Sequence, residues 1–82
     1  MAAPLAELTA IVRDVLQDTR IELQEATRFE DVANWDSMDL VSVVVEVECR
    51  FDVQFELPEI DRLTTVRELL AMIEAKRMFA AA

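Results

Sequence analysis

Glycine and histidine are both absent from this chain of 82 residues. Loops that cradle the phosphates of nucleotides depend on glycine, because its backbone allows tight turns and close approach to the phosphate oxygens. P-loop and dinucleotide-binding motifs are therefore excluded. Without histidine, the chain also lacks the side chain that ordinarily titrates near neutral pH.

Cysteine is almost as scarce, since Cys49 is the only one. A single cysteine cannot form an internal disulfide, and without histidine it cannot contribute to a zinc site or to a cysteine-histidine nucleophile. The residues Met1 to Pro4 lack the basic region and long apolar core of a secretion signal, and no apolar run is long enough to span a membrane. We expect a cytoplasmic protein with no stable membrane insertion.

Basic residues are few, with eight lysine and arginine side chains against seventeen aspartate and glutamate side chains, and the formal net charge is −9. A surface of this sign repels nucleic acid. It suits basic protein partners instead, because complementary electrostatic fields raise encounter rates and select among competitors. We therefore expect protein partners and no nucleic acid.

The length of the chain limits it to one small hydrophobic core. Such a domain has no room for a cleft with a separate catalytic lobe, and the sequence offers no convergent set of catalytic groups. The acidic residues around Asp36 lack the spacing and the turn glycine of an EF-hand calcium loop. We expect a single monomeric domain over residues 1–82, without enzymatic activity and without a resident metal.

Apolar residues recur at intervals of three and four from Leu5 to Leu16, with charged residues between them, which predicts an amphipathic helix. Pro4 suits the first position of this helix. The pattern breaks up from Gln17 to Asn34, where apolar residues are scattered among charges. We expect a long ordered loop whose apolar residues fold back on the core, with Trp35 packed beneath it.

The segment from Ser37 to Phe51 is rich in valine, a β-branched residue that by propensity favours a strand. Its spacing favours a helix, because apolar and polar residues separate onto two helical faces. The apolar face consists of Leu40, Val43, Val44, Val47 and Phe51, and the polar face of Asp39, Ser42, Glu46 and Arg50. We predict a helix, since burial outweighs a propensity cost of at most about 0.7 kcal/mol per residue.

Beyond this helix, the sequence predicts a connector from Asp52 to Leu57 with a buried Phe55. Pro58 then fits the start of a short helical turn that runs to Leu63.

A last helix begins at Thr65, because Thr65 and Glu68 have the spacing of a capping box and an apolar stripe follows as far as Ile73. The sequence therefore predicts an all-α fold, a bundle of three longer helices and one short helix. A long loop joins the first two helices.

One serine, Ser37, stands where the polar loop gives way to the valine-rich helix. If Asp36 caps this helix, Ser37 lies in the first turn, where unpaired backbone N–H groups and the helix dipole favour an attached phosphate. Local sequence alone favours an ordinary serine at a helix start, because serine and aspartate are common there.

The triplet Asp36-Ser37-Met38 resembles the Asp-Ser-Leu attachment motif of the acyl carrier protein family, with methionine in place of leucine. The resemblance extends through Phe51-Asp52 and Thr64-Thr65-Val66 to Ile73, and more loosely over the first helix. It implies a four-helix carrier domain with a 4'-phosphopantetheine arm attached to Ser37. The thiol of that arm would hold acyl groups as thioesters.

The same resemblance implies roles for the residues around the serine. Asp36 would cap the helix and lie beside the metal used by the modifying transferase, and Met38 would contact partner enzymes. A swinging arm could also fold its cargo between the helices. The residues expected to line this acyl pocket are Val43, Val47, Phe55, Ile60, Leu63 and Leu69.

The implied partners are a phosphopantetheinyl transferase and acyl-processing enzymes with basic docking patches, of the ketosynthase, reductase, dehydratase and acyltransferase types. The residues expected to dock are Asp39, Val45, Glu46, Glu48 and Asp52. Two positions that are commonly acidic in fatty-acid members are Ser42 and Cys49 here, and the outer side of the helix, with Leu40, Val41 and Val45, is unusually apolar. We therefore favour a carrier dedicated to a particular pathway.

Two other interpretations remain at this stage. The chain could be an unmodified helical adaptor that docks through the same face, or a carrier of aminoacyl groups. Covalent modification of Ser37 distinguishes a carrier from an adaptor. The aspartate before the serine and the acidic composition favour acyl over aminoacyl cargo.

Overall fold

The computed structural model describes residues 4–80. We expected a single domain over residues 1–82, and residues 1–3 and 81–82 of that range lie outside the described residues. The expectation drawn from Met1 to Pro4 also falls mostly on residues outside this range.

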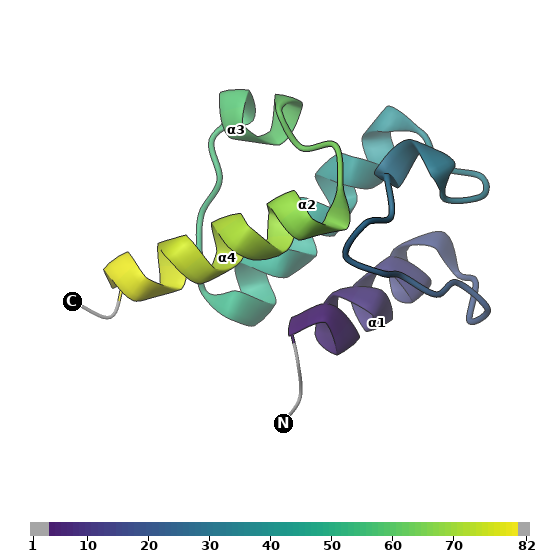
Figure 1. The fold of residues 1–82 in the computed structure, drawn as a ribbon, viewed down its shortest axis with the longest axis horizontal. Coiled ribbons are helices and arrows are strands. Elements are labelled where there is room, and N and C mark those ends of the chain that lie inside the picture. Colours follow the sequence, from purple (N-terminus) through teal and green to yellow (C-terminus); the bar gives the residue numbers. More distant parts are fainter. Residues whose placement is uncertain (1–3, 81–82) are drawn as a thin grey trace.

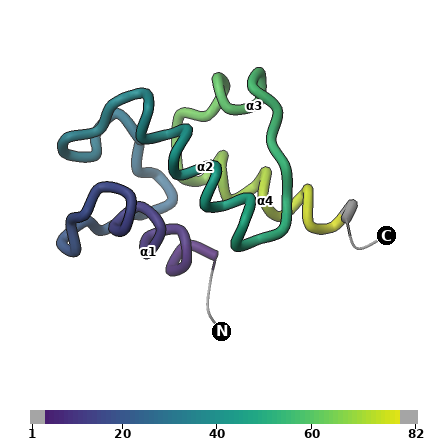
Figure 2. The backbone as a smooth tube through the Cα atoms, turned by 180° about the vertical axis from the view of Figure 1, so that it is seen from behind, coloured from purple at the N-terminus to yellow at the C-terminus, as the bar shows by residue number. Residues whose placement is uncertain are grey.

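The predicted all-α architecture is confirmed (Figure 1). The elements are α1 (Pro4–Leu16), a 3-10 turn η1 (Phe29–Asp31), α2 (Ser37–Phe51), α3 (Leu57–Asp61) and α4 (Val66–Ala80). The helix α2 packs along α1, and in both backbone views α3 lies on the side of α2 and α4 that faces away from α1 (Figure 2). The three longer helices and one short helix agree with the sequence prediction.

The long loop between α1 and α2 is ordered and folds back on the core, as predicted. Its apolar side chains Leu23, Phe29 and Val32 are buried. Three backbone hydrogen bonds attach it to the start of α4. The N–H of Phe29 donates to the carbonyl of Thr64 at 3.0 Å, and the N–H groups of Val66 and Arg67 donate to the carbonyls of Thr27 and Glu25, each at 2.9 Å. The 3-10 turn η1 within this loop has no counterpart in the sequence prediction.

Helix α2 has the predicted bounds, and the strand alternative is wrong for this segment. Val43, Val44 and Val47 are fully buried on its inner face. Burial of a valine stabilises the fold by roughly 1.5 to 3 kcal/mol, which exceeds the loss in helix propensity. The helix ends at Phe51, and the next residue, Asp52, has a φ of 56°, the left-handed conformation that glycine usually supplies after a helix.

Helices α3 and α4 differ from the prediction mainly in length. Helix α3 ends at Asp61, two residues before the predicted Leu63, and α4 continues past Ile73 to Ala80. The predicted capping box at the start of α4 is present. The Glu68 carboxylate accepts from the N–H of Thr65 at 2.9 Å, and the N–H of Glu68 donates to the Thr65 hydroxyl at 3.3 Å.

A single hydrophobic cluster draws on all four helices and both longer connections. In the connector between α2 and α3, the prediction of a buried Phe55 is wrong, because Val53 is buried and Phe55 is only half-buried at the edge of the core. The Phe55 ring instead lies under a lysine of α4.

Candidate functional site

Ser37 is the first residue of α2 and is exposed. The predicted cap is confirmed, since Oδ1 of Asp36 accepts from the N–H of Met38 at 2.8 Å and from the N–H of Asp39 at 3.1 Å. In return, Oδ2 of Asp39 accepts from the N–H of Asp36 at 2.9 Å. These reciprocal bonds form a capping box, which holds the start of the helix in one geometry and leaves the serine hydroxyl open to solvent.

The capping box changes the expected electrostatics at the serine. The sequence suggested that unpaired N–H groups of the first turn would attract a phosphate, but Asp36 already accepts from Met38 and Asp39. For these two N–H groups, the hypothesis is wrong. The helix dipole still favours an anion here, while the carboxylates of Asp36 and Asp39 oppose it unless a cation is present.

The backbone that leads into Ser37 is held by aromatic packing. Trp35 stacks on Phe29 with a ring-centroid distance of 5.3 Å. The backbone N–H of Trp35 donates to the carbonyl of Val32 at 3.1 Å. The expectation that Trp35 packs under the loop is confirmed. Asn34 has a φ of 65°, so it supplies the left-handed turn that places Trp35 and Asp36 before the helix.

The residues expected to contact partners differ in their exposure to solvent. Met38, beside the serine, is 68% exposed, and Val45 is 50% exposed. Glu46 and Asp52 are also exposed, whereas Asp39 and Glu48 are half-buried. The carboxylates of Asp39 and Glu48 both accept hydrogen bonds from backbone N–H groups.

Asp39 belongs to the capping box, and Oε2 of Glu48 accepts from the N–H of Phe55 at 2.8 Å. The expectation that Leu40 belongs to the exposed apolar side is wrong, because it is half-buried and packs against the core. Val41 does lie on that side. Leu57, at the start of α3, is 73% exposed and was missed because the sequence prediction placed it at the end of a connector.

The predicted pocket residues lie together in the interior. Five of them are buried in one cluster, and Phe55 packs at its edge; the buried five are Val43, Val47, Ile60, Leu63 and Leu69. They come from α2, α3, α4 and the connector before α4. The structure therefore brings the six residues together in and beside one interior cluster between these helices.

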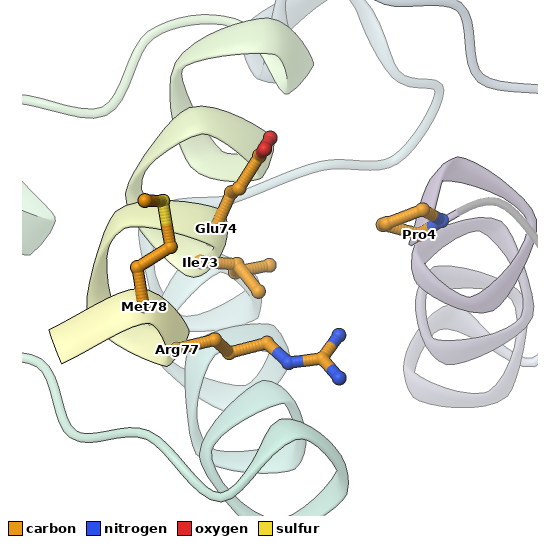
Figure 3. Close-up of a pocket in the computed structure, with 5 residues that line it drawn as sticks. All are labelled: Pro4, Ile73, Glu74, Arg77 and Met78. Atoms are coloured by element: carbon orange, nitrogen blue, oxygen red, sulfur yellow. The ribbon is translucent and has the colours of Figure 1, made fainter. Parts of the chain in front are cut away.

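A groove lies elsewhere on the molecule. It has a volume of about 530 Å³ and separates Pro4 of α1 from the second half of α4 (Figure 3). On the α4 side, its lining consists of Ile73, Glu74, Arg77 and Met78. None of the six predicted pocket residues lines it.

The perturbed carboxyl groups are remote from the serine in sequence. The N–H of Arg20 lowers the pKa of Asp18 below its ordinary value, the N–H of Glu56 does the same for Glu59, and that of Thr65 for Glu68. These are structural contacts at turns and helix starts. Within residues 4–80, no group of three or more His, Cys, Asp or Glu is arranged to hold a metal ion.

Comparison with known proteins identifies the family. The family model described as phosphopantetheine attachment site matches residues 6–73. The chain is 31% identical over 68 residues to an acyl carrier protein of Helicobacter hepaticus, covering 83% of this chain and 90% of that protein. Among its described residues, no helix has the length and apolar character needed to cross a membrane.

Solved structures agree. The holo acyl carrier protein from Geobacter metallireducens superposes with a TM-score of 0.84 at 30% identity, covering 99% of this chain and 92% of that one. An acyl carrier protein from Thermotoga maritima gives a TM-score of 0.81 over 92% of this chain and 87% of that one. At 21% identity, this second likeness concerns the fold alone.

A capped helix start with an exposed serine, inside a matched phosphopantetheine attachment region, is the arrangement of a phosphopantetheine-dependent carrier. The chain belongs to the acyl carrier protein family. It is accordingly a non-catalytic carrier protein, and its cofactor is a covalently attached phosphopantetheine. Ser37 is exposed at the start of α2, and this position fits such an attachment.

Proposed function

We propose that this protein carries acyl intermediates as thioesters on a 4'-phosphopantetheine arm attached to Ser37. The observation that carries the proposal is the position of Ser37, exposed at the first residue of α2 and held between Asp36 and Met38 by the capping box. The arm supplies the thiol that bears the acyl group. The polypeptide supplies the anchor, the docking surface and the shelter for cargo, in one carrier domain over residues 1–82.

The residues beside the serine have separate tasks in this proposal. Asp36 keeps the first turn of α2 in one conformation, so that the Ser37 hydroxyl is presented at a defined place. The carboxylates of Asp36 and Asp39 offset their repulsion of the incoming phosphate by attracting the divalent cation of the transferase. Met38 provides an apolar contact for the enzyme that approaches the arm.

The charge of the chain is concentrated around this site. Between Glu30 and Asp61, the sequence has ten acidic side chains and one arginine, so this stretch carries a formal charge equal to the whole net charge of −9. It includes α2 and α3. The charge favours enzymes with basic docking patches, such as a phosphopantetheinyl transferase and enzymes of the ketosynthase, reductase, dehydratase and acyltransferase types.

The exposed apolar residues on α2 narrow the choice of partners. Val41 and Val45 lie exposed beside Ser42 and Glu46, so the docking face combines carboxylates with an apolar patch. A partner that matches this face needs an apolar contact framed by basic residues. We propose a carrier of a dedicated lipid-related pathway in the cytoplasm, acting as a monomer. Efficient processing by housekeeping fatty-acid enzymes would contradict this dedication.

Intact-mass measurement tests the attachment directly. The protein and its Ser37→Ala variant are incubated with coenzyme A, magnesium and a broad-specificity phosphopantetheinyl transferase. A mass gain of one phosphopantetheine in the parent protein, and none in the variant, is expected. A folded parent protein that gains no mass beside an active transferase would favour the unmodified adaptor, and native cargo trapped on the thiol would separate acyl from aminoacyl use.

A further inference from the structure

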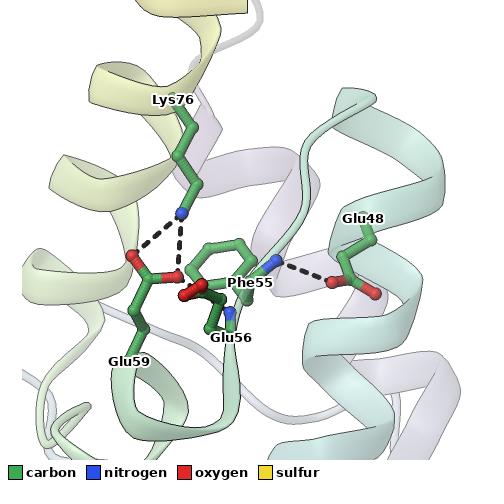
Figure 4. A network of polar contacts seen from close by, with 5 residues as sticks. All are labelled: Glu48, Phe55, Glu56, Glu59 and Lys76. Carbon is green, nitrogen blue, oxygen red and sulfur yellow. Dashed lines mark hydrogen bonds and ion pairs between the residues drawn. The ribbon is translucent and has the colours of Figure 1, made fainter.

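One polar network joins three helices on the side of the molecule where α3 lies (Figure 4). The ammonium group of Lys76, on α4, donates to both carboxylate oxygens of Glu59, on α3, each at 2.9 Å. The same ammonium lies 4.9 Å from the centroid of the Phe55 ring. The N–H of Phe55 in turn donates to Glu48 of α2, so Lys76 is connected to α2 through Phe55.

The Lys76–Glu59 pair is more shielded than the other ion pairs of the described residues. Its side chains are 24% and 33% exposed, whereas in the Arg67–Glu25 pair, also on α4, they are 69% and 60% exposed. Partial shielding reduces screening by salt, and two oxygens at equal distance restrict the geometry of the pair. The aromatic face adds a cation–π attraction, with the ammonium 4.9 Å from the ring centroid. This pair therefore holds its helices more firmly than an ordinary surface ion pair.

Helix α3 needs such a tie, because five residues are too few to form a stable helix alone. It buries Ile60 in the core, while Leu57 at its start is exposed. The pair also acts on the beginning of α3, since Oε1 of Glu59 accepts from the N–H of Glu56 at 2.8 Å in addition to its bond with Lys76. Lys76 thus orients the carboxylate that caps α3.

A cavity of about 240 Å³ lies in the seam between α3 and α4, lined by Glu59, Met72, Ala75 and Lys76. Apolar groups of Met72 and Ala75 and the two charged side chains therefore share one opening. Movement of α3 away from α4 would widen this seam and would withdraw Ile60 from the core. The ion pair lies across the path of that movement.

We propose that Phe55, Glu59 and Lys76 form a latch that holds α3 against α4 and controls the passage of acyl cargo between the interior and solvent. The α3 latch, as we call these three residues, is closed in the structure. Its role for cargo rests on the proposed attachment at Ser37, whereas its role in holding α3 does not. Loss of the latch should leave the rest of the fold in place, since none of its three residues is fully buried.

Backbone hydrogen exchange in the unmodified protein tests the latch without any cargo. In Lys76→Met, the amides of Glu59, Ile60 and Leu63, which donate within α3 and its end, should exchange about fivefold faster than in the parent protein, because local opening is less opposed. Amides within α1 should not change. Arg67→Met, which removes another ion-pairing side chain from α4, should leave α3 exchange unchanged.

A double-mutant cycle assigns the effect to the pair. Glu59→Gln removes the charge but keeps an oxygen that can accept from the N–H of Glu56. The double variant with Lys76→Met should exchange in α3 no more than about twofold faster than either single variant, because each change removes the same interaction. Additive effects of the two changes, or unchanged α3 exchange in Lys76→Met, would overturn the latch.

The role for cargo is tested on the loaded protein. With a medium-length acyl chain on the arm, the thioester of Lys76→Met should be cleaved by hydroxylamine about threefold faster than that of the parent or of Arg67→Met, since the cargo spends less time sheltered. Equal cleavage rates in all three proteins would overturn this role. Failure of Ser37 to gain mass would instead refute the attachment, and the exchange experiment would still decide whether α3 is latched.

Discussion

The acidic stretch from Glu30 to Asp61 and the remainder of the chain are opposites in charge. The stretch has ten acidic side chains and one basic side chain, whereas the remainder has seven of each. In the remainder, two ion pairs connect residues of this balanced set, Arg20 with Asp18 and Arg67 with Glu25. Repulsion between like charges is thus concentrated in the part of the chain that contains Ser37.

The two parts of the chain therefore contribute differently to the fold and to the proposed function. The balanced part supplies α1, most of the long loop and α4, which together enclose much of the core. The acidic stretch supplies the serine and the face that we propose for docking. Its cost is self-repulsion, which the capping box and the Lys76–Glu59 pair partly offset. The acidic side chains that we propose for docking therefore also lower the stability of the fold through their mutual repulsion.

The largest effect is expected from reversing charges in the acidic stretch. Glu46→Lys with Asp52→Lys should lower the kcat/KM of the phosphopantetheinyl transferase for this protein by about tenfold or more at low salt, because the encounter loses its electrostatic steering. Both side chains are exposed, so folding should persist, with a small loss of stability because lysine suits the left-handed backbone at position 52 less well than aspartate does. The matched control reverses Glu7 and Glu22 in the balanced part, and an equal loss in that control would mean that only total charge matters.

The next effect concerns the cap beside the serine. Asp36→Ala removes the acceptor for the N–H groups of Met38 and Asp39 and should lower the free energy of unfolding by about 1 kcal/mol. For a domain of this size, that corresponds to a fall in Tm of roughly 4 to 8 °C. Thermal unfolding followed by circular dichroism measures it. Asp36→Asn, which retains an oxygen acceptor, should lose less, and an equal loss would assign the effect to charge.

A smaller effect is expected from divalent cations. Millimolar magnesium should raise the Tm by about 2 °C, because cations relieve repulsion among carboxylates of the acidic stretch. Sodium chloride at matched ionic strength provides the control for general screening. The rise should shrink in the Glu46→Lys, Asp52→Lys variant. An unchanged or lowered Tm would indicate that repulsion in this stretch does not limit stability.

Features that depend on neighbours in sequence were predictable. The bounds of α2, the Asp36 cap and the capping box of Thr65 and Glu68 follow from residues within four positions of one another. The helical face of α2 also followed, because its valines repeat with a helical spacing. The resemblance of the Asp36-Ser37-Met38 triplet then led to the family that the comparisons show.

Features that depend on packing were not predictable. Glu59 and Lys76 are 17 positions apart in the sequence, and no local sequence pattern predicts that they form an ion pair. Phe55 was expected in the core, yet the connector turns it toward Lys76 and buries Val53 instead. The use of Asp39 and Glu48 as structural acceptors likewise depends on where the neighbouring N–H groups lie.

The pH dependence of stability allows two carboxyl groups to be compared. Glu68 contacts only neighbours in sequence, Thr64 and Thr65, whereas Glu59 also contacts the distant Lys76. Backbone N–H groups lower the pKa of both carboxyls below the ordinary value of 4.5, from Thr65 and Thr64 for Glu68 and from Glu56 for Glu59, to which the Lys76 ammonium adds. The fold therefore favours the ionised forms. Their stabilisation is fully present above pH 4.5 and is lost as the pH falls through the lowered pKa values.

Unfolding by urea between pH 7 and pH 3 measures this loss, at a constant salt concentration that limits changes in screening. The parent protein should lose stability below pH 4.5, and Glu59→Gln and Glu68→Gln should each show a shallower loss, because one of the responsible carboxyls no longer titrates. In Lys76→Met, the loss due to Glu59 should shrink without vanishing, since the N–H of Glu56 still favours its ionised form. An unchanged pH profile in Lys76→Met would show that the lysine does not act on Glu59 in solution, and the contact across the seam would then contribute less than the cap within α3.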